Sequence, residues 1–186
     1  MAGPWPAGTR GPPVRLRMCL DNMCFHTYCD DMRSALQAEL KQTRPFPSPE
    51  TEAVLSIART AALLDHALAQ VLKPAGITPT QYNVLRILRG AGAEGLCRSA
   101  IGERMVTSVP DVTRLLDRLE AAGLITRSRG TDDRRFVTTV ITEAGLQLLA
   151  GLDAPVEALN RRQLSHVGRP ALRTLIDTLA RARARV

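Results

Sequence analysis

Four arginines gather around one short polar segment, where their guanidinium groups could contact phosphates and groove edges of DNA. They are Arg127, Arg129, Arg134 and Arg135. The segment is turn-forming and joins two β-rich runs, and an arginine at a hairpin tip fits a narrow, strongly negative minor groove. The neighbouring Asp132 and Asp133 can orient a guanidinium through a charge-assisted hydrogen bond. The alternative is a solvated hairpin whose charges compensate one another.

A second set of polar side chains lies just before this cluster, on one face of a predicted helix that begins near Ser108. Pro110 fits the first turn of such a helix. The opposite, apolar face consists of Val112, Leu115, Leu116 and Leu119. On the polar face, Arg114 and Arg118 can fork onto guanine or phosphate, and Ser108 and Thr113 can donate to phosphate oxygens. The alternative is an ordinary surface helix.

Apolar spacing and turn residues predict the elements that must position these side chains. The helices run from Ser48 to before Pro74, from Thr78 to Gly90, over about residues 98–104, from Ser108 to Ala121, from Thr142 past Asp153, and over about residues 170–184. Strands are predicted over residues 124–129 and 136–141. Pro155 either kinks its helix or marks a break. A short helix, a tight turn and a second helix form a helix-turn-helix, and the following hairpin makes it winged.

The overall charge is consistent with an anionic partner. The formal net charge is +7 and the isoelectric point is about 10.0, which favours nucleic acid or a membrane surface as the partner. No apolar run approaches the ~18 residues of a membrane span, and the chain starts without the apolar stretch of a signal peptide. We therefore expect a cytoplasmic protein with reduced cysteines. Because no phosphate loop, nucleophile elbow or metal-binding histidine pair occurs, we expect no enzymatic activity.

The composition changes sharply near Ser48. Residues 1–49 hold seven of the twelve prolines, three of the four cysteines and four of the six aromatic residues. We expect residues 1–47 to form a poorly ordered N-terminal extension and residues 48–186 to form the folded domain. One hypothesis places the natural translation start at Met32, and an intact Met1 or Ala2 terminus in mass spectrometry would contradict it.

Two stretches of the folded part resemble the MarR family of winged helix-turn-helix transcriptional regulators. The run from Ser108 to Glu120, continued by Ala122-Gly123-Leu124-Ile125, is similar to the recognition helix of that family. Asp133-Arg134-Arg135, followed after five residues by Ile141-Thr142-Glu143-Ala144-Gly145, is similar to its wing signature. The resemblance covers roughly residues 50–183. Ile141 stands where the family usually has Leu, and Gly102 stands where Ala is usual.

The resemblance implies a mainly α, α+β fold: a winged helix-turn-helix with long N- and C-terminal dimerisation helices. Residues 78–145 would form the DNA-binding lobe, and residues 48–74 and 146–185 the dimerisation helices. The implied function is that of a ligand-responsive repressor, a homodimer on a palindromic operator in double-stranded DNA. The family also implies that Arg135 enters the minor groove and that Asp133 braces it. Arg129 and Arg134 are then expected to contact phosphate.

The signal that releases the DNA is left open by the sequence. Family members commonly bind ligands between the dimerisation helices and the DNA-binding lobe, so Asp65, His66 and Tyr82 are candidates for lining such a pocket. The alternative for these three is a role in packing or at the helix surface. Cys97 begins the short helix, where the helix dipole can lower a thiol pKa, and redox sensing is therefore an alternative to ligand release.

Two further alternatives concern metals and proteins. The spacing of Cys19, Cys24 and Cys29, with His26 between them, does not match the usual zinc pattern, so we expect no metal and no cofactor. A winged-helix module that binds another protein is the remaining alternative, and the arginine cluster argues against it.

Overall fold

The computed structural model describes residues 34–129 and 137–184, and the chain divides into two compact units. The first unit comprises Met1–Ser56 and contains the short helix α2 (Ala35–Glu39), capped by the Ser34 hydroxyl, which accepts the Gln37 backbone N–H at 3.2 Å. Residues 34–47 of the predicted N-terminal extension therefore include a helical turn. The rest of that extension, with Met32, lies outside the described residues.

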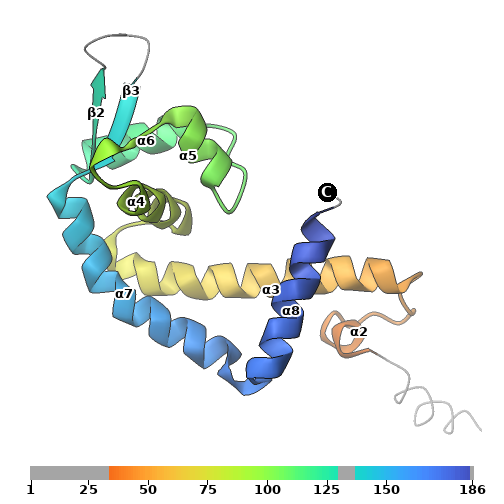
Figure 1. Cartoon of the computed structure of the whole chain (residues 1–186). Coiled ribbons are helices and arrows are strands. Elements are labelled where there is room, and N and C mark those ends of the chain that lie inside the picture. The colour runs from red at the N-terminus through yellow and green to blue at the C-terminus, as the bar shows by residue number, and fades with distance from the viewer. Residues whose placement is uncertain (1–33, 130–136, 185–186) are drawn as a thin grey trace, which may run out of the picture. The chain divides into compact units, whose positions relative to one another are not determined.

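The second unit comprises Ile57–Val186 and is mainly helical with a small antiparallel sheet (Figure 1). Its first helix, α3 (Pro49–Leu72), begins in the first unit and ends in the second. The elements that follow are η2 (Lys73–Ala75), α4 (Pro79–Ala91), η3 (Gly92–Glu94), β1 (Leu96–Cys97), α5 (Arg98–Arg104), α6 (Val112–Ala121), β2 (Ile125–Arg129), β3 (Val137–Ile141), α7 (Glu143–Leu164), η4 (Ser165–Val167) and α8 (Arg169–Arg183). This order confirms the predicted winged helix-turn-helix.

Side-chain caps start the helices at the expected places. At α4, the Thr78 hydroxyl accepts the Gln81 N–H at 3.2 Å while the Gln81 side chain accepts the Thr78 N–H at 2.9 Å, which confirms the predicted capping box. At α7, the Thr142 hydroxyl accepts the Gly145 N–H at 3.2 Å and donates to the carbonyl of Gly123 at 2.7 Å. The second bond ties the start of α7 to the turn that follows α6.

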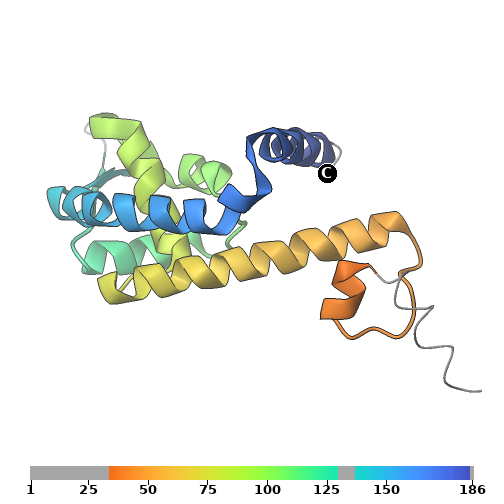
Figure 2. The same cartoon turned by 90° about the horizontal axis from the view of Figure 1, so that it is seen from below.

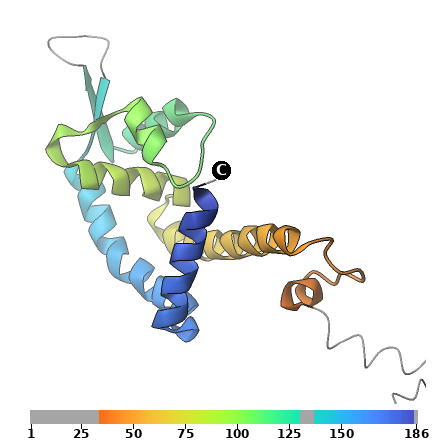
Figure 3. The same cartoon turned by 45° about the vertical axis from the view of Figure 1, so that its right-hand side comes forward.

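A single apolar core holds the helix-turn-helix and the sheet together. Helix α4 contributes Val84, Leu85 and Leu88, each with no exposed surface, and it contacts α5, α7 and β3. The other buried members include Leu72, Ile101, Leu116, Leu119, Ile125, Ile141 and Leu149. In Figures 1 and 3, α4 runs beneath α5 and α6, with the strands beyond one end. Burial of these side chains is the main favourable contribution to this packing.

The sheet has the strand order β1-β3-β2, with both pairs antiparallel. Ile125 pairs with Ile141 at one end of the hairpin and Arg129 with Val137 at the other. Strand β1 was not predicted, because two residues are too few to show a period. Gly95 permits it: its φ is +63°, and a Cβ there would collide with the backbone of Thr139.

The start of α6 corrects the sequence prediction. The helix begins at Val112 rather than near Ser108, because the Asp111 carboxylate accepts the Arg114 N–H at 2.8 Å and acts as the N-cap. In addition, proline disfavours helical geometry in the residue before it, here Val109. Ser108 and Pro110 therefore lie in the loop that leads into α6.

The two C-terminal helices differ in how their apolar side chains are covered, because α7 buries several of them and α8 leaves some exposed. Helix α7 continues through Pro155, so this proline does not mark a break between two helices. Helix α8 follows η4, contains no buried residue, and leaves Leu175 43 % and Ile176 62 % exposed. Figure 2 shows α8 beyond the far end of α7 from the winged lobe. None of the described helices is long and apolar enough to cross a membrane.

Candidate nucleic-acid interface

Helix α6 presents an exposed polar face beside the sheet. Leu116 and Leu119 anchor it, at 2 % and 0 % exposure, so the opposite face is held toward solvent. That face carries Thr113, Arg114 and Arg118, all exposed, as the sequence predicted. Two guanidinium groups and a hydroxyl on a rigid helix can donate to base edges and phosphates in a major groove.

The remaining predicted DNA contacts are placed only in part. Ser108 is exposed in the loop before α6, as is Pro110. Arg129 is the last residue of β2, and its side chain is not among those described. Asp133, Arg134 and Arg135 lie outside the described residues, so their predicted roles in the wing stay predictions.

Arg127 is the member of the predicted cluster whose side chain the structure describes, and it is paired with carboxylates. Its Nη2 lies 2.7 Å from Oδ1 of Asp117, and its Nε donates to Oε2 of Glu120 at 2.9 Å. Glu120 and then Asp117 raise the pKa of the guanidinium, which in turn lowers the pKa of the Glu120 carboxyl. Both carboxylates belong to α6, so Arg127 ties β2 to the predicted recognition helix. Periodicity gave no signal for this cross-link.

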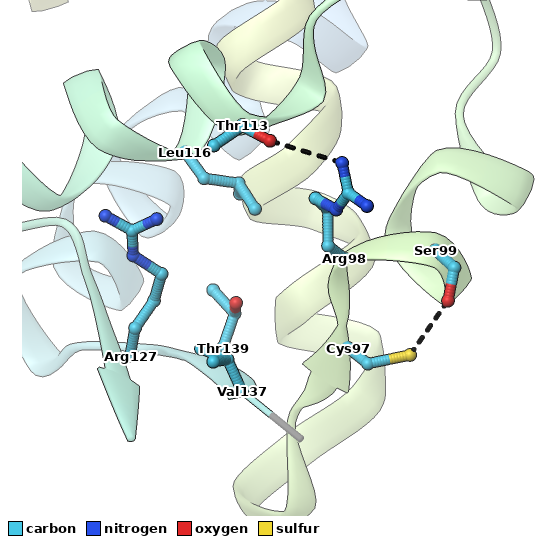
Figure 4. Close-up of a pocket in the computed structure, with 8 residues that line it drawn as sticks. All are labelled: Cys97, Arg98, Ser99, Thr113, Leu116, Arg127, Val137 and Thr139. Carbon is cyan, nitrogen blue, oxygen red and sulfur yellow. Dashed lines mark hydrogen bonds between the residues drawn. The ribbon is translucent and has the colours of Figure 1, made fainter. Parts of the chain in front are cut away.

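A cavity of about 410 Å³ lies between α5, α6 and the strands. Figure 4 shows its lining side chains, with Arg98 and Arg127 on opposite sides and Leu116 and Thr139 between them. Arg98 reaches from the start of α5 to α6, where its Nη1 donates to Oγ1 of Thr113 at 3.3 Å. Sequence reasoning did not select Arg98, whose signal is its position at the first residue of the short helix.

Cys97 lines the same cavity and is partly exposed. Its Sγ lies 3.2 Å from Oγ of Ser99, and the Ser99 hydroxyl, followed by the backbone N–H of Ala100, lowers the pKa of the thiol. The thiol is therefore more readily ionised than an ordinary cysteine, as its place at the start of the helix led us to expect.

A second cavity, of about 510 Å³, lies where α3 meets α4 and the loop after α5. Asp65, Tyr82 and Arg86 line it together with apolar side chains such as Leu68 and Ile87. Tyr82 is 5 % exposed, and the Arg86 Cζ lies 5.8 Å from the centre of its ring. His66 is exposed on α3 and is not among the lining residues.

Within residues 34–129 and 137–184, no group of three or more histidine, cysteine or acidic side chains is placed to hold a metal ion. Cys19, Cys24, His26 and Cys29 lie outside these ranges. The fold and the exposed face of α6 define the class: a winged helix-turn-helix protein.

The particular family follows from similarity to known proteins. Residues 77–137 match the model of the MarR family. A MarR transcription factor from Planctomyces limnophilus, known from its crystal structure, is 36% identical to this chain, with a TM-score of 0.57. The match covers 73% of this chain and 98% of that protein. The chain belongs to the MarR family of transcriptional regulators.

Other relatives are similar over less of their length or share the fold alone. The transcriptional repressor MdtR of Bacillus subtilis is 37% identical over 78 residues, 42% of this chain and 49% of MdtR. The chain thus spans about half the length of the curated relatives it matches: 44% of one HTH-type regulator and 49% of MdtR. The crystal structure of the MepR–DNA complex of S. aureus matches with a TM-score of 0.66 at 20% identity, over 72% of this chain and 97% of MepR.

Proposed function

We propose that this protein is a repressor that binds a palindromic operator as a homodimer, with α6 in the major groove and the β2–β3 hairpin at the adjacent minor groove. The exposed face of α6, with Thr113, Arg114 and Arg118, carries the proposal. The residues proposed to contact DNA are Ser108, Pro110, Thr113, Arg114, Arg118, Arg129, Arg134 and Arg135. Asp133 is proposed to brace Arg135. MdtR supports repression and the MepR complex supports DNA binding in this fold.

Dimerisation is supported by apolar side chains that one chain leaves uncovered. On α3, Val54 is 64 % and Ile57 48 % exposed, and on α8, Ile176 is 62 % exposed. Apolar stripes on two long helices are stabilised when a second copy covers them. A two-fold dimer then matches a palindrome whose half-sites lie about one helical turn, ~34 Å, apart.

The cavity between α3 and α4 is the proposed effector site. Tyr82 and Arg86 offer an aromatic ring and a cation, and Leu68 and Ile87 offer apolar surface, which suits a small aromatic or lipophilic molecule. His66, predicted from the sequence as a second ligand contact, is the weaker candidate because it does not line the cavity. A ligand screen with Tyr82→Ala as control tests this assignment: a releasing ligand whose effect survives the substitution binds elsewhere.

Selection of bound sequences from random duplex DNA tests the proposed function. We expect a palindromic consensus, and an asymmetric consensus or no enrichment would overturn the homodimeric operator model. On the selected operator, Arg135→Ala should lower the affinity without changing dimerisation. Asp133→Ala should lower the affinity by a smaller factor. Steep salt dependence separates DNA binding from the protein-interaction alternative, because phosphate contacts release counterions.

Redox sensing is a second candidate, favoured by the lowered pKa of Cys97 in a cavity beside α6. Peroxide treatment of the purified protein should then reduce operator affinity, and Cys97→Ser should abolish the response. Unchanged operator affinity after oxidation, verified by mass spectrometry at Cys97, would reject this candidate.

A further inference from the structure

Polar side chains from two helices and two strands line the cavity between α5, α6 and the strands. Arg98 and Ser99 come from α5, Thr113 from α6, Arg127 from β2 and Thr139 from β3. Leu116, 2 % exposed, closes it toward the core. Figure 4 shows the Arg98 guanidinium directed across the cavity mouth toward Thr113, whose hydroxyl accepts from it at 3.3 Å. The side chain is thus held in place by a weak, long hydrogen bond that a stronger acceptor can replace.

The two arginines of this cavity differ in their charge balance. Arg127 is paired with Asp117 and Glu120, so its charge is compensated within the protein. Among the residues that the structure describes, ion pairs involve Arg89, Arg127 and Arg161, and none involves Arg98. Within that described part, Arg98 is therefore the arginine of the cavity whose charge has no carboxylate partner. A guanidinium and nearby hydroxyls are the donors that bind a phosphate oxygen.

The position of the cavity follows the geometry of duplex DNA. One phosphodiester strand separates a major groove from the neighbouring minor groove. If α6 occupies the major groove and the β2–β3 hairpin reaches the minor groove, that strand must pass between them. The cavity opens at this place, because Thr113 belongs to α6 and Arg127, Val137 and Thr139 belong to the two strands.

We propose that this cavity binds one backbone phosphate of the DNA strand that passes between α6 and the hairpin, and that Arg98 is its principal ligand. The Thr113 hydroxyl, now an acceptor from Arg98, turns to donate to the phosphate, and Ser99 contributes a second hydroxyl. The inference rests on the proposed function and adds a contact from α5, outside both the recognition helix and the predicted wing cluster.

Arg98→Gln tests the proposal on the operator found by selection. Arg44→Gln is the matched control, since it removes the same charge from an exposed position outside the DNA-binding lobe and the expected dimerisation helices. Arg98→Gln should lower the affinity by about tenfold or more. It should also reduce the slope of log K against log salt by about 0.9 for each protomer. Equal affinity and equal slope for the two variants would overturn the proposal.

Neutral methylphosphonate linkages then locate the contact. Each linkage of the operator is neutralised in turn, and binding of wild type and Arg98→Gln is compared. At one position per half-site, on the strand between the two grooves, the neutral linkage should lower the affinity of the wild type. The affinity of Arg98→Gln should be the same there as on unmodified DNA. If the variant responds to every linkage as the wild type does, the cavity does not hold a DNA phosphate.

Cys97 provides an independent probe inside the cavity. A variant with serine at Cys19, Cys24 and Cys29 keeps Cys97 as its single thiol. Iodoacetamide and iodoacetate add groups of similar size, neutral and anionic respectively. The anionic adduct should bind the operator more weakly than the neutral one, and bound operator should slow both reactions. Equal affinity for the two adducts would contradict the proposed phosphate. Failure of the unmodified wild type to bind any DNA would instead refute the proposed function.

Discussion

Replacing Gly145 with alanine is expected to destabilise the protein, because the start of α7 has no room for a Cβ atom. A Cβ there would press against the carbonyl oxygen of Leu124 and the side chain of Ile141. The same carbonyl accepts the Thr142 N–H at 3.0 Å, so relief of the contact must shift α7 against the base of the hairpin. Overpacking of this kind costs about 1–3 kcal/mol, whereas alanine gains at most about 1 kcal/mol of helix propensity over glycine. We expect a net loss of up to about 2 kcal/mol.

Gly151→Ala is the matched control in the same helix. A Cβ at Gly151 would meet nothing within 4 Å, so only the gain in helix propensity remains. Urea unfolding of both variants and the wild type, followed by circular dichroism at one fixed protein concentration, measures the difference. The expected order of stability is Gly151→Ala, wild type, Gly145→Ala. If Gly145→Ala is as stable as Gly151→Ala, the close packing of α7 on Leu124 is refuted.

Three further changes test other contacts. Arg127→Ala should weaken operator binding because α6 loses its tie to β2, and Arg127→Lys should fall between it and the wild type; equal operator affinities would contradict this role. Arg89 lowers the pKa of the Asp153 carboxyl in the folded protein. Their ion pair therefore stabilises the fold fully at pH values above the pKa of the unfolded carboxyl, about 3.9. This stabilisation is lost as the pH falls through the lower pKa of the folded state. In Asp153→Asn, the free energy of unfolding should therefore fall less steeply at acid pH, as measured by urea titrations at a series of pH values. The same pH dependence as in the wild type would count against the pair. Thr78→Ala should cost about 1 kcal/mol by the same urea method, and no loss would show that the capping box contributes nothing.

Local signals in the sequence were sufficient for most of the helices. The capping box at Thr78 and the cap at Thr142 act through hydrogen bonds to residues three positions ahead, so the amino-acid order alone reveals them. The apolar face of α6 was also predicted correctly, since Leu116 and Leu119 are buried. The predicted start of α6 was wrong. Ser108 and Asp111 are both good N-cap residues, but Pro110 disfavours helical geometry at Val109, and this local signal, which favours Asp111, was overlooked.

Contacts between distant residues were beyond such reasoning. Strand β1 forms only because Leu96 pairs with Thr139, far along the chain. The contacts of Arg98 and Arg127 could not be read from the sequence. Arg127 faces Asp117 and Glu120 and becomes a cross-link, while Arg98, which the sequence analysis passed over, reaches Thr113 in the cavity.

By itself, the sequence determined that this chain contains a helix-turn-helix followed by a hairpin, because caps, turns and apolar periods are local properties of the chain. It also determined which helix face is polar. Only the tertiary structure decided that Arg127 is paired within the protein, because that depends on which carboxylates the packing of α6 against the strands brings within hydrogen-bonding distance. The basic cluster was visible in the sequence, whereas the pairing of Arg127 was a property of the fold.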